Sequence, residues 1–355
     1  MNNHLLNVSN LSVDFTKNNT LVRAVDDISF HVDEGEILGI AGESGSGKSV
    51  STTAMVKLLN PRSAKISGEV SFEGKNILKL TSKALRAIRG RDISMIFQDP
   101  MNSLTPVYTV GQQIVEQIRT HQSISRSEAK KMAIDLLDRV RIPAASRRVH
   151  SYPHELSGGM RQRVAIAMAL SCNPKLLIAD EPTTALDVTT QAQVLGLMRE
   201  LKDEFGTAII LITHDMGVLA GMCDRIQIMY SGRTVESGPR REVLDQPRHP
   251  YTWGLLGAVP SVRGDRARRL VAIPGSAPGA QPVEQLQGCG FRDRCPVAFD
   301  KCVYTPPLEP SSPNPHHVDA CWLEPGERGT RRAEVEQQRL YGETTAVPEP
   351  QEEVL

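Results

Sequence analysis

The residues Gly42-Glu43-Ser44-Gly45-Ser46-Gly47-Lys48-Ser49 fit the pattern G-x-x-x-x-G-K-[ST]. An apolar run at 36–41 precedes them and predicts a buried strand, and residues 50–59 predict the helix that follows. In such a turn the backbone N–H groups point inward at a helix N-terminus and bind anions. Lys48 can reach the outer phosphates of a nucleotide, and the Ser49 hydroxyl can bind Mg²⁺. Residues 42–49, here called the phosphate loop, therefore predict an α/β nucleotide-binding fold.

The composition narrows the class of protein. A chain of 355 residues suggests about two domains, and its 41 Lys and Arg residues are balanced by 41 Asp and Glu residues. The net charge of zero therefore gives no overall electrostatic attraction to nucleic acid. Aromatic residues make up 4% of the chain, which is too few for a surface on which bases stack. No apolar run approaches the roughly 18 residues of a membrane span, and the N-terminus lacks the features of a signal peptide. These totals predict a soluble, cytosolic chain that reaches a membrane only through partners.

Apolar patterning indicates two kinds of strand. Residues 11–15 and 28–32 alternate like antiparallel strands, and residues 68–97 are expected to continue that pattern. Continuous apolar runs at 176–180 and 207–213 are typical of parallel strands covered on both faces. The core is therefore expected to combine a parallel sheet with an antiparallel portion.

A helical region and a change of composition divide the chain further. Ser125 and Glu128 form a capping-box pattern ahead of apolar residues at helical spacing, so we expect an inserted helical lobe at about 100–165. Beyond about residue 250 the character changes, and the polar end of the chain predicts a flexible tail. The expected organisation is a main domain at 1–250, a C-terminal region at 251–323 and a tail at 324–355.

Two carboxylates end the strand at 176–180. Asp180 fits the carboxylate that holds nucleotide-bound Mg²⁺, and Glu181 is placed to polarise a water that attacks the γ-phosphate. Taken alone, this pair could equally be a solvated acidic turn at the end of a strand.

A second glycine-rich helix start lies at Leu156-Ser157-Gly158-Gly159, and Gln162 follows it in a helix rich in Ala and Met. The helix dipole and the Ser157 hydroxyl make another anion site there. The chain has only one phosphate loop, so this second anion-binding helix start has no nucleotide of its own to bind. It would have a use if it bound the nucleotide of another molecule.

With these motifs the chain resembles the ATP-binding-cassette (ABC) family across residues 1 to about 250. The resemblance implies a P-loop NTPase fold with a RecA-like core, an antiparallel β-subdomain and a helical lobe, followed here by a small cysteine-containing C-terminal extension. It also implies two cassettes arranged head to tail. Each ATP would then lie between the phosphate loop of one chain and the signature of the other, formed by Leu156, Ser157, Gly158, Gly159 and Gln162.

The resemblance assigns roles to further residues. Gln98 matches the Q-loop glutamine, His214 the switch histidine and Asp187 the D-loop, so Glu181, His214 and Gln98 form the implied catalytic set. Phe15 sits where the family places an aromatic that stacks on adenine, although an apolar residue in an N-terminal strand can equally belong to the core. The implied ATP-binding set is Phe15, Gly42, Glu43, Ser44, Gly45, Ser46, Gly47, Lys48 and Ser49, and the implied magnesium ligands are Ser49, Gln98 and Asp180.

Residues 249 to about 323 narrow the resemblance to the peptide and nickel importer group, on His249-Pro250-Tyr251-Thr252 and Gly288-Cys289-x-Phe291-x-x-Arg294-Cys295-Pro296. That group implies an ATP-hydrolysing motor subunit that drives uptake of dipeptides or oligopeptides from the cytoplasmic face of the membrane. Its implied partners are a second, often non-identical, cassette, two integral membrane permease subunits and an extracytoplasmic solute-binding protein, without nucleic acid.

In the family a groove beside the Q-loop accepts a short helix of the permease. The resemblance therefore implies that residues 99–120 form the permease-binding surface; the alternative is that they are solvent-exposed helical residues with no partner. The alternatives for the whole chain are an importer of nickel chelates or glutathione, a soluble cassette ATPase acting on DNA or ribosomes, and an iron–sulfur regulatory protein with a vestigial ATP fold.

Four of the six cysteines lie between 289 and 321. Clustered thiols in a cytosolic chain suggest a metal before a disulfide. The tight C-x-x-C pair of most zinc sites is absent, whereas four thiolates suit an iron–sulfur cluster. The resemblance implies a [4Fe–4S] cluster on these residues, with zinc and unligated thiols as alternatives. They are Cys289, Cys295, Cys302 and Cys321.

Overall fold

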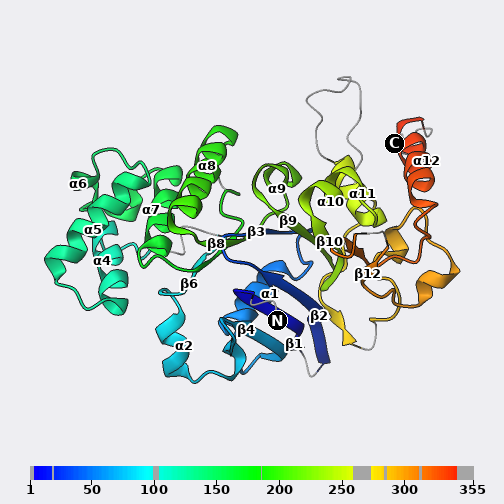
Figure 1. The fold of residues 1–355 in the computed structure, drawn as a ribbon, viewed down its shortest axis with the longest axis horizontal. Coiled ribbons are helices and arrows are strands. Elements are labelled where there is room, and N and C mark those ends of the chain that lie inside the picture. Colours follow the sequence, from blue (N-terminus) through cyan, green and yellow to red (C-terminus); the bar gives the residue numbers. More distant parts are fainter. Residues whose placement is uncertain are drawn as a thin grey trace, which may run out of the picture.

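The computed structural model describes residues 4–17, 20–98, 104–184, 186–258, 273–283, 286–311 and 314–341. Two sheets form the centre of the molecule, with the helical lobe at one end and the C-terminal extension at the other (Figure 1). Strand order in the larger sheet is β12-β13-β10-β9-β3-β8-β7-β6, and in the smaller sheet β11-β2-β1-β4-β5.

The larger sheet has a parallel core, as the apolar runs predict. Strands β3 (Ile37–Ala41), β7 (Leu176–Asp180) and β8 (Ala208–Ile212) are buried at every residue. They pair in parallel with one another or with β6 (Ile93–Ile96) and β9 (Arg225–Tyr230). Burial on both faces follows because helices α8 (Val188–Phe205) and α9 (Met216–Met222) cover one face, and α1 with the smaller sheet covers the other (Figure 1).

The smaller sheet is antiparallel, and the expected strands at 11–15 and 28–32 lie inside its two longest members. It comprises β1 (Leu6–Lys17), β2 (Thr20–Val32), β4 (Ala64–Phe72), β5 (Lys75–Asn76) and β11 (Gln281–Pro282). The expectation that this pattern continues to residue 97 is confirmed for β4, β5 and a last strand at 93–96, and is wrong for the segment between them. Residues 77–79 form a 3-10 turn and Ser82–Ile88 form helix α2, because the Thr81 side chain caps that helix by accepting from the backbone of Ala84. Strand β6 then joins the larger sheet.

The first helix, α1 (Lys48–Met55), begins two residues earlier than expected and ends four residues earlier. Its N-terminal residue is therefore Lys48 itself, which follows Gly47 directly. This start places the backbone N–H groups of Lys48 and Ser49 in the first turn, where they have no partner within the helix and are free to bind anions.

Most of the expected helical lobe is confirmed, although residues 100–103 lie outside the described part. It contains α4 (Val110–His121), α5 (Arg126–Arg139), α6 (Ala145–Arg148) and α7 (Gly158–Leu170). The capping box is present, because Ser125 and Glu128 each accept from the other's backbone N–H, at 3.2 and 2.9 Å. Among the described helices, none combines the length and apolarity needed to cross a bilayer.

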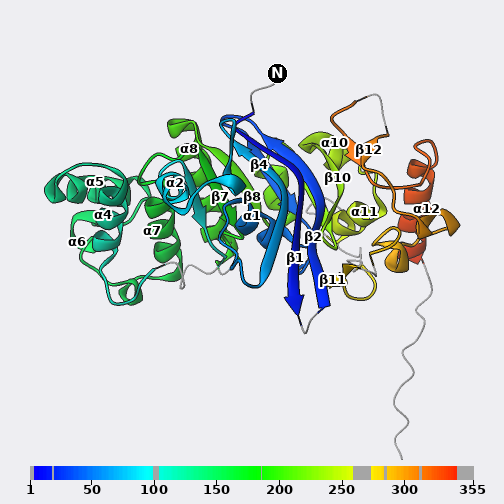
Figure 2. The ribbon, with the colours of Figure 1, turned by 90° about the horizontal axis from the view of Figure 1, so that it is seen from below.

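The C-terminal extension completes both sheets. Strand β13 (Val318–Asp319) pairs with β10 (Arg233–Pro239), and β12 (Glu309–Pro310) follows it, while β11 pairs with β2 at the edge of the smaller sheet (Figure 2). Helices α10 (Arg240–Asp245) and α11 (Pro250–Gly257) lead into the extension, which also contains the short turns Arg292–Arg294 and Asp300–Val303.

The tail expected at 324–355 is partly a helix, α12 (Arg328–Tyr341). Its first residue, Arg328, is 7% exposed and donates to Asp319 at 2.7 Å and to the carbonyl of Leu323 at 2.8 Å. These buried contacts hold the helix against the extension, which a purely polar reading of the sequence could not reveal. Residues 342–355 lie outside the described part of the chain.

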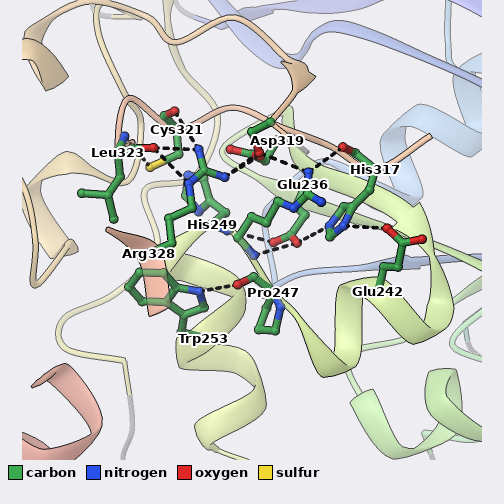
Figure 3. Close-up of polar contacts among 12 residues, drawn as sticks. Glu236, Glu242, Pro247, His249, Trp253, His317, Asp319, Cys321, Leu323 and Arg328 are labelled. Carbon is green, nitrogen blue, oxygen red and sulfur yellow. Dashed lines mark hydrogen bonds and ion pairs between the residues drawn. The ribbon is translucent and has the colours of Figure 1, made fainter. Parts of the chain in front are cut away.

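A buried polar network joins the extension to the main domain (Figure 3). Glu236 of β10 is fully buried and accepts from the backbone N–H groups of Arg248 and His249, at 2.9 and 3.0 Å. Its carboxylate also lies 2.8 Å from Nε2 of the buried His317. Because each partner belongs to a different segment, the network fixes β10, the approach to α11 and β13 relative to one another.

Candidate functional site

The phosphate loop connects the buried strand β3 to helix α1, and its turns require glycine. Gly42 has φ 152° and Gly47 has φ 96°, in the region that favours glycine. A Cβ at Gly42 would lie 2.2 Å from the carbonyl oxygen of Met229, and one at Gly47 would lie 2.5 Å from that of Ala24. The loop is therefore pressed against two neighbouring strands and cannot accept side chains at these positions.

Lys48 lies inside the curve of this loop. Its Nζ donates to the carbonyl oxygens of Gly42 and Glu43, at 2.7 and 2.9 Å. Burial lowers the pKa of Lys48, while the nearby carboxylates of Glu181 and Asp180 oppose that shift. The ammonium group is thus held where the loop would receive phosphate oxygens.

Asp180 and Ser49 meet at the end of β7. The Ser49 hydroxyl donates to Asp180 Oδ1 at 2.9 Å, and the Asp180 carboxylate is 4% exposed. Burial raises the pKa of Asp180, and the hydrogen bond from Ser49 counters the rise. A hydroxyl and a carboxylate side by side are the hard oxygen donors that Mg²⁺ prefers.

Glu181 stands at the centre of a convergent set of side chains. Its carboxylate accepts from Gln98 Nε2 at 3.1 Å and from the Thr184 hydroxyl at 2.8 Å, and lies 3.3 Å from His214 Nδ1. The structure therefore brings together the three residues of the predicted catalytic set, which come from three different strand ends. The backbone of Glu181 is in the left-handed region, at φ 45°, a strained geometry typical of functional sites.

The environment of Glu181 keeps its carboxylate ionised. Burial alone would raise the pKa of Glu181, but the hydrogen bonds from Thr184 and His214 outweigh burial and hold the pKa below its ordinary value. An ionised carboxylate with directional partners suits a group that polarises water. Thr184 is not in the predicted catalytic set, and its one signal in the sequence is a hydroxyl three residues after Glu181.

The signature lies at the start of helix α7. Ser157 caps the helix by accepting from the backbone N–H of Met160 at 3.3 Å, and Ser157 and Gly158 are exposed. Leu156 and Gln162, in contrast, are 4% and 1% exposed. These two are packed within their own chain, and their contact with a neighbour's nucleotide stays a prediction.

Asp187 caps the next helix, α8, beside the signature. Its side chain accepts from the Thr190 backbone at 2.9 Å and from the Thr190 hydroxyl at 2.7 Å. A Cβ on Gly159 would lie only 2.8 Å from Thr190. The starts of α7 and α8 are thus adjacent. Ala185, the first residue of the predicted D-loop, lies outside the described residues.

Phe15 occupies an intermediate position in β1. It pairs with Val22 of β2 and Ala64 of β4, and its half-buried side chain packs against the smaller sheet's core. Part of the ring therefore belongs to the core, and its stacking on adenine stays a prediction.

The four C-terminal cysteines lie in one region of the extension. Burial first, and then the nearby thiols of Cys321, Cys289 and Cys302, raise the pKa of the Cys295 thiol to about 12. The backbone N–H of Cys289 donates to the carbonyl of Cys302 at 2.9 Å. Among the described residues, only one group of three or more His, Cys, Asp or Glu side chains has its ligand atoms within 4.8 Å of one another, and that group does not contain these cysteines. The four sulfurs are therefore not arranged as the ligands of a single ion.

That other group consists of His4, His31 and Asp33 near the N-terminus. The Arg225 guanidinium lies against His31 Nε2, and because arginine can only donate, this nitrogen accepts. The other ring nitrogen of neutral His31 then carries the proton and has no lone pair for a cation. These residues therefore do not fit a metal site.

An open groove lies beside Gln98, with a volume of about 290 Å³. Two of its large apolar residues are exposed, Leu58 at 44% and Phe97 at 43%. Among the described residues that line the groove, only Gln117 falls in the predicted permease surface at 99–120, and the others come from other segments. Its lining includes Leu58, Arg89, Met95, Phe97, Gln117 and Met168.

Comparisons with known proteins match two family models. Residues 25–184 match "ABC transporter", and residues 235–302 match "Oligopeptide/dipeptide transporter, C-terminal region". The "Oligopeptide transport ATP-binding protein OppD" of Salmonella typhimurium is 51% identical over 320 residues, which cover 90% of this chain and 94% of that protein. A "Probable peptide ABC transporter ATP-binding protein" of Sinorhizobium fredii is 50% identical over 319 residues, with the same coverage.

Solved structures agree with these matches. An ATP-binding cassette described as a dimer in a post-hydrolysis state, bound to ADP and Pi, has a TM-score of 0.60 and 29% identity, and covers 66% of this chain and 99% of its own. A component of an ABC transporter complex from Clostridium perfringens has a TM-score of 0.58 and 30% identity, over 69% of this chain and 92% of its own.

Proposed function

Because this chain belongs to the ABC transporter ATP-binding proteins of the oligopeptide and dipeptide group, we propose that it powers peptide import with the residues gathered at the phosphate loop. It is the ATP-hydrolysing motor subunit of an importer. The observation that carries the assignment of roles is the convergence of Gln98, Thr184 and His214 on the Glu181 carboxylate, next to Ser49 and Asp180.

Each residue has a defined task in hydrolysis. Lys48 and the N–H groups at the start of α1 bind the outer phosphates, and Ser49 and Asp180 hold Mg²⁺ with Gln98 beside them. Bound Mg²⁺ supplies charge neutralisation on the phosphates. Glu181 accepts a hydrogen bond from the attacking water and aligns it, while His214 fixes the carboxylate from the far side.

The second half of the site comes from a neighbouring cassette. Ser157 and Gly158 are exposed at a helix N-terminus, a geometry suited to the γ-phosphate of a nucleotide held by another chain. The dimeric cassette with bound ADP and Pi supports this arrangement by similarity. The neighbour is a homologous cassette, identical or not.

The groove beside Gln98 is the proposed docking surface for a permease helix. Leu58 and Phe97 offer apolar contacts, and the adjacent Gln98 links the groove to Glu181. Two integral membrane subunits, with an extracytoplasmic binding protein, complete the proposed importer. This chain then works peripherally at the cytoplasmic face of the membrane.

The C-terminal cysteines are proposed to hold a [4Fe–4S] cluster, within the region proposed at 251–323. Ligands of one zinc ion must approach closely, since each Zn–S bond is about 2.3 Å. Cluster ligands bind different corners of an iron–sulfur cube, so three or more of them need not lie within 4.8 Å of one another, and the four cysteines as described are compatible with a cluster. Anaerobic purification followed by iron and sulfide analysis tests this, with Cys295→Ser as the variant expected to lose both. Full occupancy by zinc would contradict the proposal.

Transport itself is tested in proteoliposomes that contain the full complex with its permeases and binding protein. ATP-dependent uptake of labelled dipeptides and oligopeptides is expected, and Lys48→Ala should abolish it. Nickel chelates and glutathione serve as competing solutes. Uptake of one of these without uptake of any peptide would replace the peptide assignment.

A further inference from the structure

A side chain of the C-terminal extension binds directly to the phosphate loop. The Arg294 guanidinium donates to both carboxylate oxygens of Glu43, at 2.6 and 3.0 Å, although the two residues are 251 positions apart in the chain. The Arg294 side chain is 9% exposed and lies over the rings of Tyr230 and Phe291. The Glu43 side chain is 27% exposed, and a bidentate pair that is partly buried in this way is a stronger and more directional contact than a fully exposed ion pair.

The remaining contacts of Arg294 extend this junction. Its guanidinium donates to the Tyr230 hydroxyl at 3.2 Å and to the carbonyl oxygens of Pro274 and Gly275, at 2.7 and 3.2 Å. One planar group therefore ties the phosphate loop, strand β9 and a segment of the extension together. Lysine could not reproduce this, because a single ammonium lacks the fixed fork of donors.

The backbone of Glu43 connects this junction to Lys48, a residue of the ATP-binding set. Its N–H donates to the Tyr251 hydroxyl at 2.7 Å, and its carbonyl accepts from Lys48 Nζ at 2.9 Å. Glu43 is thus held at three points: at its side chain by Arg294, at its N–H by helix α11, and at its carbonyl by Lys48. A movement of the Glu43 side chain would therefore also move the Glu43 carbonyl that accepts a hydrogen bond from Lys48.

We propose that Arg294 is a positioning residue for ATP binding, which holds Glu43 so that the phosphate loop keeps its receptive shape. The C-terminal extension then sets the nucleotide affinity of the cassette in addition to any role of its cysteines. The proposal rests on the assignment of the phosphate loop as the ATP site. Arg294 itself does not contact the reacting atoms, so its effect falls on binding before turnover.

The test measures ATP affinity and steady-state hydrolysis in the purified transporter complex. Arg294→Met is expected to raise both the Kd and the KM for ATP about tenfold, with kcat within about twofold, because a charge-assisted bidentate contact is lost. Arg294→Lys should weaken affinity in the same direction. The matched control is Arg292→Met, two residues away, where the side chain is 42% exposed and, among the described residues, forms an ion pair only with the adjacent Asp293.

A second variant separates positioning from folding. Glu43→Gln keeps the shape of the loop while removing the charge, and should raise the KM as Arg294→Met does, with little further change when the two are combined. Melting temperatures show whether each variant is folded. The proposal is overturned if both single variants keep the wild-type KM, or if their effects multiply in the double variant. If the wild-type complex binds no ATP, the phosphate-loop assignment fails first and the proposal fails with it.

Discussion

Glu181 shows how one residue can serve structure and chemistry together. Its backbone N–H donates to the carbonyl of Ile212 at 2.9 Å, which joins the end of β7 to β8. Its side chain meanwhile gathers Gln98, Thr184 and His214. The left-handed backbone at this position costs free energy, and the strand contacts around it hold it in place. A carboxylate whose position is fixed in this way needs little reorganisation before it acts in the proposed role of general base.

Replacing Glu181 tests its role as the general base. Glu181→Gln should bind ATP normally but hydrolyse it about 10²- to 10⁴-fold more slowly, because an amide cannot take up a proton. Binding is measured with a fluorescent ATP analogue and turnover by phosphate release. Glu200→Gln on the exposed face of α8 is the control. If the turnover of Glu181→Gln is within a few fold of that of Glu200→Gln, Glu181 is not the general base.

Thr184 is expected to set the pH range of hydrolysis. Its hydrogen bond holds the pKa of Glu181 down, so Thr184→Val should raise that pKa. The ionised form is then lost at a higher pH as the solution is acidified, and the acid limb of the kcat profile should move to higher pH. Thr184→Ser retains the hydroxyl and should keep the wild-type profile. Identical acid limbs for valine and wild type would contradict this prediction.

At the scale of elements, the adjacent starts of α7 and α8 form one functional unit. Ser157 and Asp187 each cap their own helix, and Gly159 allows the close approach between them. Capping leaves the first-turn N–H groups of α7 near the surface, where an anion from another chain can bind. The anion site of this unit therefore lies at the surface. It belongs to helix α7, whereas the chain's own phosphate loop leads into helix α1.

A large side chain at this surface should block the composite site. Ser157→Arg in the Glu181→Gln background is expected to retain ATP binding but to lose the ATP-dependent dimer, because the arginine fills the space of the neighbour's phosphates. Light scattering with and without ATP gives the association state. Glu155→Arg, an exposed position just before the signature, is the charge control. Persistent ATP-dependent dimers of Ser157→Arg would show that the signature does not contact the neighbour's nucleotide.

The elements also show what sequence can and cannot predict. Parallel strands such as β7 and the capping box of α5 follow from local patterns, so the sequence located them to within a residue or two. Helix α2 was missed because its short apolar pattern resembles a strand, and only the Thr81 cap distinguishes it. Contacts between distant segments, such as Arg294 with Glu43, leave no periodic trace, since each residue alone looks like an ordinary surface charge.

At the scale of the whole molecule, the extension is part of the core's construction. Glu236, His317 and Asp319 lie in the buried network that Figure 3 shows, and all three are at most 3% exposed. Buried polar groups are costly unless partnered, so the network stabilises one arrangement of the extension against the sheet and disfavours others. The cassette and its extension should consequently unfold together.

His249 is expected to make the folded state sensitive to acid. It is 1% exposed, and burial lowers its pKa to about 4, whereas an unfolded histidine keeps about 6.5. Between these values the unfolded chain binds a proton that the folded chain excludes, so stability falls as the pH drops through this window. His249→Asn, which can still cap α11, should flatten the slope, so that on the order of 3 kcal/mol less stability is lost across this pH window. Equal slopes in chemical denaturation from pH 7 to 4 would contradict this.

Strand β13 completes an edge of the larger sheet with residues 318 and 319, while the strand it pairs with ends some eighty positions earlier. During synthesis, a ribosome therefore releases the main part of the sheet well before its last strand emerges. The exposed rim of β10 is during that interval a site where another nascent chain could pair. Premature termination between residue 250 and strand β13 should accordingly yield insoluble product instead of a smaller working motor.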